Sequence, residues 1–184
     1  MQLIFDVLLT ALSIFVIGTH AVVGKSHFKS REMPPGANLV AVAVLLALAV
    51  YLLLLWTHES PLAAQLFGLG AGLISLWLFH RTVAASRDGA LHFAFDVEHP
   101  VSLVTAGPYR LVRHPFYTSY LLFWTGMAIS TWSLWALPVL LLIVGMYTLA
   151  ARDEERKFSS STMSAEYAAY RSRTGMFLPR LAAK

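Results

Sequence analysis

Five long apolar runs limit how this chain can fold. A helix needs about 20 predominantly apolar residues to cross the hydrocarbon core of a bilayer. The fourth run is short for a full crossing, so we expect it to begin earlier, inside residues 111–112, or to be shielded by neighbouring helices. The pattern predicts an all-α integral membrane protein with five transmembrane helices, the last two forming a C-terminal helical hairpin, followed by a cytoplasmic helical segment. The runs are Leu3–Val23, Ala37–Trp56, Pro61–Phe79, Phe116–Ser130 and Leu134–Ala150.

Composition supports a membrane protein. The chain is 57% hydrophobic and 13% charged, whereas soluble domains carry roughly 25% charged residues. The sequence has no cysteine, which excludes disulfides, thiolate metal sites and a cysteine nucleophile. We therefore expect one membrane domain over residues 1–184.

The basic residues fix an expected orientation. All 14 lysines and arginines fall in the connectors 24–36 and 80–115 or in the tail 151–184. Five crossings would put these three stretches on one side, which the positive-inside rule makes cytoplasmic, with the N-terminus outside. The same rule accounts for the net charge of +4, so we expect no nucleic-acid partner.

Small residues and one histidine within the runs suggest packing roles. Gly68, Gly70 and Gly72 have spacings that allow close approach between helices. His20 lies near the end of the first run, where we expect it to be a packing or interfacial residue.

A charged stretch, residues 107–117, lies between the apolar runs. It contains two arginines, one histidine, two tyrosines and two prolines. Ionisable groups beside hydrocarbon are costly and usually have a function. We interpret this stretch as the entrance to a binding site.

The tail carries a second polar pattern. Dense charge follows the last run at 152–156, and Tyr167 and Tyr170 have a spacing that puts them on one face of a helix. A solvated helix with aromatic anchors would explain the tail alone equally well.

Several reaction classes have no motif here. No histidines are paired at metal-ligand spacing, no nucleophile elbow marks a serine hydrolase, and no glycine-rich phosphate loop follows a strand. Arginines, a pair of glutamates and tyrosines remain. Arginine binds carboxylates or phosphates, glutamate suits an ammonium group, and aromatic faces suit a sulfonium. This set fits a zwitterionic cofactor that meets an anionic lipophilic acceptor.

Together, these motifs resemble the isoprenylcysteine carboxyl methyltransferase family, and membrane phospholipid methyltransferases share a similar pattern. The resemblance covers residues 105 to 180, and the first three runs match only as generic membrane helices. The ordered set is Gly107-x-Tyr109, Arg113-His114-Pro115-x-Tyr117, Glu154-Glu155, Glu166-Tyr167-x-x-Tyr170-x-x-Arg173 and Leu178-Pro179.

The resemblance implies an integral membrane enzyme that uses S-adenosylmethionine and no metal. Residues 1–84 would form three transmembrane helices, and 85–184 the cofactor-binding and catalytic part. The family usually has glycine where this chain has Ser119, and the spacing leaves open which glutamate meets the cofactor. The implied catalytic residues are Arg113, Glu155 and Arg173, the two arginines facing the acceptor. The implied cofactor-binding residues are Gly107, Pro108, Tyr109, His114, Pro115, Tyr117, Glu154, Tyr167 and Tyr170.

The acceptor is expected to be a lipophilic molecule that enters from the bilayer. A carboxylate acceptor is already ionised at neutral pH, whereas an amine acceptor would need Glu154 or Glu155 as a base. Phospholipid or amine N-methylation is the close alternative. A sterol-type NADPH reductase and a non-catalytic membrane protein are the alternatives of other classes. The oligomeric state stays open.

Overall fold

The computed structural model describes residues 1–27, 35–87 and 102–180. The connector 28–34, the segment 88–101 and residues 181–184, which carry some of the basic residues discussed above, lie outside the described residues. The described elements are α1 (Gln2–His27), α2 (Pro35–Thr57), α3 (Leu62–Ser86), the 3-10 helix η2 (Gly107–Arg110), α4 (Pro115–Ser130), α5 (Ala136–Ser159) and α6 (Ser164–Arg173).

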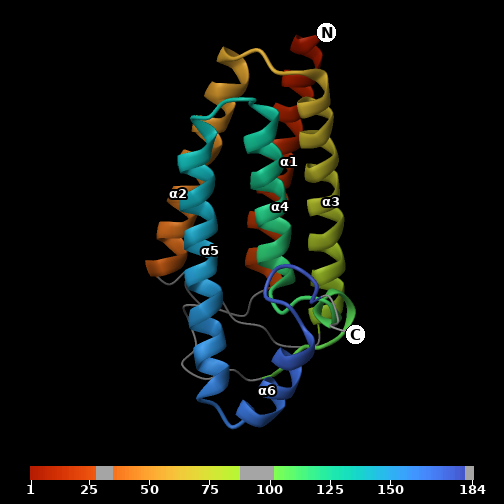
Figure 1. The fold of residues 1–184 in the computed structure, drawn as a ribbon, viewed down its shortest axis with the longest axis vertical. Coiled ribbons are helices and arrows are strands. Elements are labelled where there is room, and N and C mark those ends of the chain that lie inside the picture. Colours follow the sequence, from red (N-terminus) through yellow and green to blue (C-terminus); the bar gives the residue numbers. More distant parts are fainter. Residues whose placement is uncertain (28–34, 88–101, 181–184) are drawn as a thin grey trace.

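The long helices lie side by side and alternate in direction, with α6 below their lower end (Figure 1). The expected all-helical membrane protein is confirmed, because α1, α2, α3 and α5 are each long and apolar enough to cross a bilayer. At 16 residues, α4 is shorter than these four. It packs against α3 and α5.

The bundle buries aromatic and aliphatic side chains between its helices and leaves leucines on its outside. Tyr51 and Leu55 of α2, Trp124 and Met127 of α4, and Ile143 of α5 form the centre of the core. The outward leucines and valines of α2 and α3 are exposed in the isolated chain. Lipid tails are as apolar as leucine, so helix association in a bilayer depends on close packing and polar contacts instead.

Glycines bring α3 and α4 into close contact. A Cβ at Gly68 would lie 2.6 Å from the Cβ of Ser130 and 3.1 Å from the carbonyl oxygen of Gly126. A Cβ at Gly72 would lie 2.8 Å from a methyl group of Leu12 on α1. The packing prediction is therefore right for Gly68 and Gly72. It is wrong for Gly70, which has nothing within 4 Å of its Cβ position.

Polar contacts between α1, α3 and α4 add to this packing. Gln65 of α3 donates a 2.9 Å hydrogen bond to Asp6 of α1, and both side chains are buried. Ser119, at the position where the family usually has glycine, is fully buried in α4. Its hydroxyl donates to the carbonyl of Phe116 at 2.7 Å, and its own carbonyl accepts from the hydroxyl of Ser75 of α3 at 2.7 Å. The serine thus fits the α3–α4 interface.

His20 packs as expected. Its ring centroid lies 4.4 Å from that of Phe79 on α3 and 4.7 Å from that of Tyr120 on α4.

Substitution of Gly68 by valine should destabilise the bundle, because a helix interface that holds two glycine backbones has no room for the added methyl groups. Overpacking of this kind costs about 1–3 kcal/mol. Thermal unfolding in detergent should show a lower midpoint for Gly68→Val than for Gly70→Val, which adds the same atoms on the same helix where nothing is in contact. Equal midpoints would contradict the assigned α3–α4 contact.

Candidate active site

Two segments that are distant in sequence pair through their backbones at the lower end of the bundle. The amide of Arg113 donates to the carbonyl of Gly175 at 2.8 Å, and the amide of His114 donates to that of Met176 at 3.2 Å. In return, Gly175 donates to the carbonyl of Leu111 at 3.2 Å. Val112 and Gly175 thus form a parallel bridge. The pairing joins the segment before α4 to the segment after α6.

We call this backbone pairing of residues 111–114 with 175–176 the joint, and it requires glycine at two positions. A Cβ at Gly175 would lie 1.7 Å from the carbonyl oxygen of Leu178, so the tight bend behind it admits no side chain. Gly107 has φ +57°, and a Cβ there would lie 2.7 Å from that of Ala85. Only glycine adopts this conformation without strain, and it lets η2 rest on the end of α3.

Two tyrosines fix α6 on this joint. The hydroxyl of Tyr170 donates to the carbonyl of Tyr109 at 2.7 Å. Burial raises the pKa of Tyr170 to about 12, so the hydroxyl keeps its proton and its role as donor. Tyr167 stacks on Phe158 of α5 with ring centroids 4.9 Å apart. The shared face expected for the two tyrosines is the buried face of α6.

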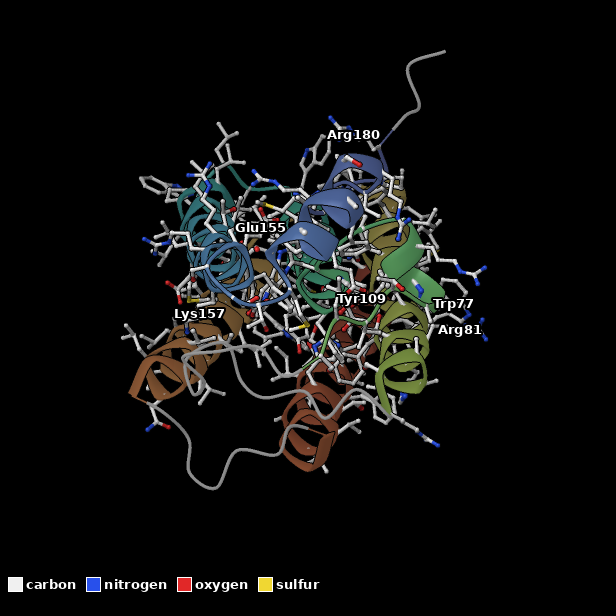
Figure 2. The ribbon with its side chains drawn as sticks, turned by 90° about the horizontal axis from the view of Figure 1, so that it is seen from below. Trp77, Arg81, Tyr109, Glu155, Lys157 and Arg180 are labelled. Atoms are coloured by element: carbon white, nitrogen blue, oxygen red, sulfur yellow. The ribbon has the colours of Figure 1, made fainter. Side chains whose placement is uncertain are left out.

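Glu155 is the buried anion of the site. Its side chain is 6% exposed and accepts a 2.7 Å hydrogen bond from Nε of Arg113. Nε2 of His114 lies 3.3 Å from the same oxygen, and Nε of Arg171 lies 3.7 Å from the other. A buried carboxylate needs such partners to stay ionised. Figure 2 shows Glu155 between the helices in the view from below.

Glu154 is more open. Its side chain is 27% exposed, with Nδ1 of His114 at 3.2 Å from one oxygen and a 2.5 Å hydrogen bond from the hydroxyl of Tyr117 to the other. Both ring nitrogens of His114 therefore face a carboxylate. Burial lowers the pKa of His114, but the hydrogen bonds and charges of Glu154 and Glu155 outweigh it and raise the pKa above its ordinary value. The two carboxylates therefore favour the protonated imidazole.

Aromatic rings continue from this ionic cluster into the bundle. His114 stacks with Tyr117 at 5.6 Å between centroids, and Tyr117 stacks with Tyr147 of α5 at 5.4 Å. Tyr120 lies 5.4 Å from Tyr147 and leads on to His20. The cluster is thus next to a row of aromatic side chains from α4 and α5, which we call the aromatic wall.

The structure brings most of the expected site residues together. Arg113, His114, Tyr117, Glu154 and Glu155 form one cluster, and Pro115 begins α4 beside them. The expected backbone-shaping residues Gly107, Pro108 and Tyr109 form η2, while Tyr167 and Tyr170 support the cluster from α6.

Arg173 does not join the cluster. It is exposed, and its guanidinium carbon lies 6.0 Å above the ring of Tyr170. Arg171 instead approaches Glu155. Helical spacing does not separate the two arginines, since Arg171 is four residues from Tyr167 and Arg173 is three from Tyr170. Tyr147 was also missed, because a tyrosine in an apolar run carries no distinguishing pattern.

A family model described as phospholipid methyltransferase matches residues 64–166, from α3 into α6. This chain belongs to that family. The family of membrane methyltransferases includes the isoprenylcysteine carboxyl methyltransferases, so the expected resemblance is confirmed. Membership indicates a membrane methyltransferase.

A curated relative matches part of the chain. The cobalt-zinc-cadmium resistance protein CzcN of Cupriavidus metallidurans is 43% identical over 81 residues, which is 44% of this chain and 37% of that protein. This chain therefore spans about 37% of the relative's length. Within residues 1–27, 35–87 and 102–180, no group of three or more His, Asp and Glu side chains is arranged to hold a metal ion.

The raised pKa of His114 predicts a pH-dependent stability. A histidine whose pKa is higher in the folded state than in the unfolded state stabilises the fold. This contribution is complete at pH values below the unfolded pKa of 6.5 and is lost as the pH rises through the folded pKa. The free energy of unfolding in detergent should thus fall as pH increases above 6.5. His114→Gln should remove that slope, whereas His80→Gln, on the exposed side of α3, should keep it. A slope unchanged by His114→Gln would contradict the ion pairs.

Proposed function

We propose that this protein is an S-adenosylmethionine-dependent methyltransferase that acts on a lipophilic acceptor in the bilayer, most like the carboxyl O-methylation of isoprenylcysteine. Family membership supports methyl transfer. The observation that carries the proposal is the partly open carboxylate of Glu154, held by His114 and Tyr117 beside a wall of aromatic rings.

The residues present fit this cofactor. The Glu154 carboxylate is 27% exposed and suits an ammonium group. Aromatic side chains suit a sulfonium cation, and Tyr117 and Tyr147 lie next to the Glu154 carboxylate. The buried hydroxyl of Tyr167, next to Arg113, has no acceptor for its proton among the described residues and offers a donor. The cofactor, when bound, supplies an electrophilic methyl group on sulfur.

The two glutamates would have different roles. Glu155 is held by Arg113, His114 and Arg171, so we assign it to positioning the cluster. Glu154, the more exposed, would contact the cofactor. A carboxylate acceptor needs no base because it is ionised at neutral pH, and the site then only has to align donor and acceptor. If the acceptor were an amine, as in phospholipid N-methylation, Glu154 would be the accessible base.

The proposed topology has five crossings, with α4 as the fourth, the N-terminus outside and the site on the cytoplasmic side. The arrangement of the described elements supports it. The segments that carry Arg110, Arg113 and the basic residues of α6 all lie at the lower end of the bundle, opposite the N-terminus (Figure 1). The positive-inside rule favours this end as cytoplasmic. The acceptor would then reach the site from the bilayer and the cofactor from the cytoplasm.

Calorimetry on the detergent-purified protein should detect binding of S-adenosylmethionine, and Glu154→Gln should weaken it. A hydrogen bond to a charged group contributes about 1.5–3 kcal/mol, so the affinity should fall by about 10- to 100-fold. Glu166→Gln on the exposed side of α6 is the control and should bind as the wild type does. Wild-type protein that binds NADPH and no S-adenosylmethionine would be a reductase instead.

The proposed acceptor role of Arg173 can be tested apart from folding, because among the described residues its exposed side chain lies over Tyr170 of its own helix and pairs with no other segment. Arg173→Ala should elute as a monodisperse species and keep its affinity for S-adenosylmethionine. Its apparent KM for N-acetyl-S-farnesylcysteine should rise, measured as alkali-labile methyl ester. An unchanged KM would remove Arg173 from the acceptor site.

Alkali-stable methylation of phosphatidylethanolamine, in place of ester formation, would establish the N-methylation alternative.

A further inference from the structure

An open hollow of about 590 Å³ lies on the outer side of the joint between the two paired segments. The backbone of Gly175, which pairs with Leu111, forms part of its wall. The exposed face of α6 forms another part. The residues that line it are Arg113, Ala168, Arg171, Ser172, Thr174, Gly175, Met176 and Arg180.

The hollow combines arginine side chains with a mostly apolar surface. Three of its lining residues are arginines, and none of those described there is acidic. Glu155 lies behind Arg113 and Arg171 and offsets part of their charge, but its side chain is 6% exposed. Arg113 is 8% exposed, so the exposed guanidinium groups at the hollow are those of Arg171 and Arg180.

Arg180 keeps donors available to a ligand. Its Nη1 donates to the carbonyls of Ser172 and, at 3.3 Å, Arg171 at the end of α6. Its Nε and Nη2 make no hydrogen bond within the described residues. The free side of a guanidinium presents two parallel N–H groups, which match a phosphate bidentately. Figure 2 shows Arg180 at the outer edge of the lower end, away from Glu155.

Two exposed leucines adjoin the hollow. Leu111 is 59% exposed and Leu178 is 78% exposed. The carbonyl of Leu111 accepts from Gly175, and the carbonyl of Leu178 lies against the same glycine, so both residues are next to the lining. Exposed leucines beside arginines give this surface an apolar and a cationic part. A soluble anion would use only the cationic part.

We propose that this hollow binds the phosphate of an anionic phospholipid, with the glycerol and the upper acyl chains against Leu111 and Leu178. Arg171 and Arg180 would bind the phosphate. The site is distinct from the Glu154 cluster and does not depend on methyl transfer. Arg113 and Arg171 link the two, since both line the hollow and approach Glu155. A bound lipid would therefore hold the paired segments at the membrane surface.

The test uses the full-length protein in mixed micelles that contain phosphatidylglycerol or phosphatidylcholine. Native mass spectrometry should show wild-type protein retaining one phosphatidylglycerol in preference to phosphatidylcholine. Arg180→Glu should reduce this retention at least tenfold, and the neutral Arg180→Gln should reduce it less. The control is Arg156→Glu, which makes the same charge change on α5, where the side chain is 79% exposed and outside the hollow.

Several outcomes would overturn the site. Equal losses for Arg180→Glu and Arg156→Glu would mean that only the overall charge attracts lipid. Equal retention of the two lipids by wild-type protein would show no anion selectivity. Displacement of phosphatidylglycerol by millimolar inorganic phosphate would mean a soluble-anion site.

Leu178→Ser provides a variant that keeps every charge, and it should also lower retention. Size-exclusion profiles and affinity for S-adenosylmethionine, measured on the same samples, report folding and the methyltransferase site separately.

Discussion

The ion pair between Arg113 and Glu155 holds the lower end of the molecule together. Arg113 comes from the segment before α4 and Glu155 from α5, and the same guanidinium donates to the carbonyl of Thr174 after α6. Three parts of the chain therefore meet at one side chain. Loss of one partner of a buried pair costs about 3–5 kcal/mol, because the other charge remains without compensation. The cluster around Glu154 shares His114 with this pair.

Much of the fold follows from local sequence, but the rotation of each helix does not. Apolar length alone predicts α1, α2, α3 and α5, and the spacing of Tyr167 and Tyr170 predicts their common buried face. Neighbouring residues on a helix point about 100° apart. Which of Glu154 and Glu155 is buried therefore depends on how α5 packs against the tail, and spacing could not decide it. The same limit applies to α6, where the resemblance implied Arg173 and the structure places Arg171 near Glu155.

The structure distinguishes the two adjacent glutamates of α5, which family membership alone would not. A short stretch of paired backbone, made possible by Gly175, brings arginines and a histidine to two adjacent carboxylates on α5. One carboxylate is enclosed and the other is partly open. In the proposed function, the first would support the cluster and the second would contact the cofactor. A carboxylate also faces each ring nitrogen of the buried His114, which favours its protonated form.

The helices meet in two different ways. Gly68 and Gly126 bring the α3 and α4 backbones together, whereas Tyr117 and Tyr147 separate α4 from α5 by stacked rings with centroids 5.4 Å apart. Rings can tilt by rotation about side-chain bonds, but two touching backbones cannot yield without moving whole helices. The α4–α5 boundary is therefore the compliant one. A hydrocarbon chain that wedges into the bundle would part it there, directly above Glu154, and leave the α3–α4 contact undisturbed.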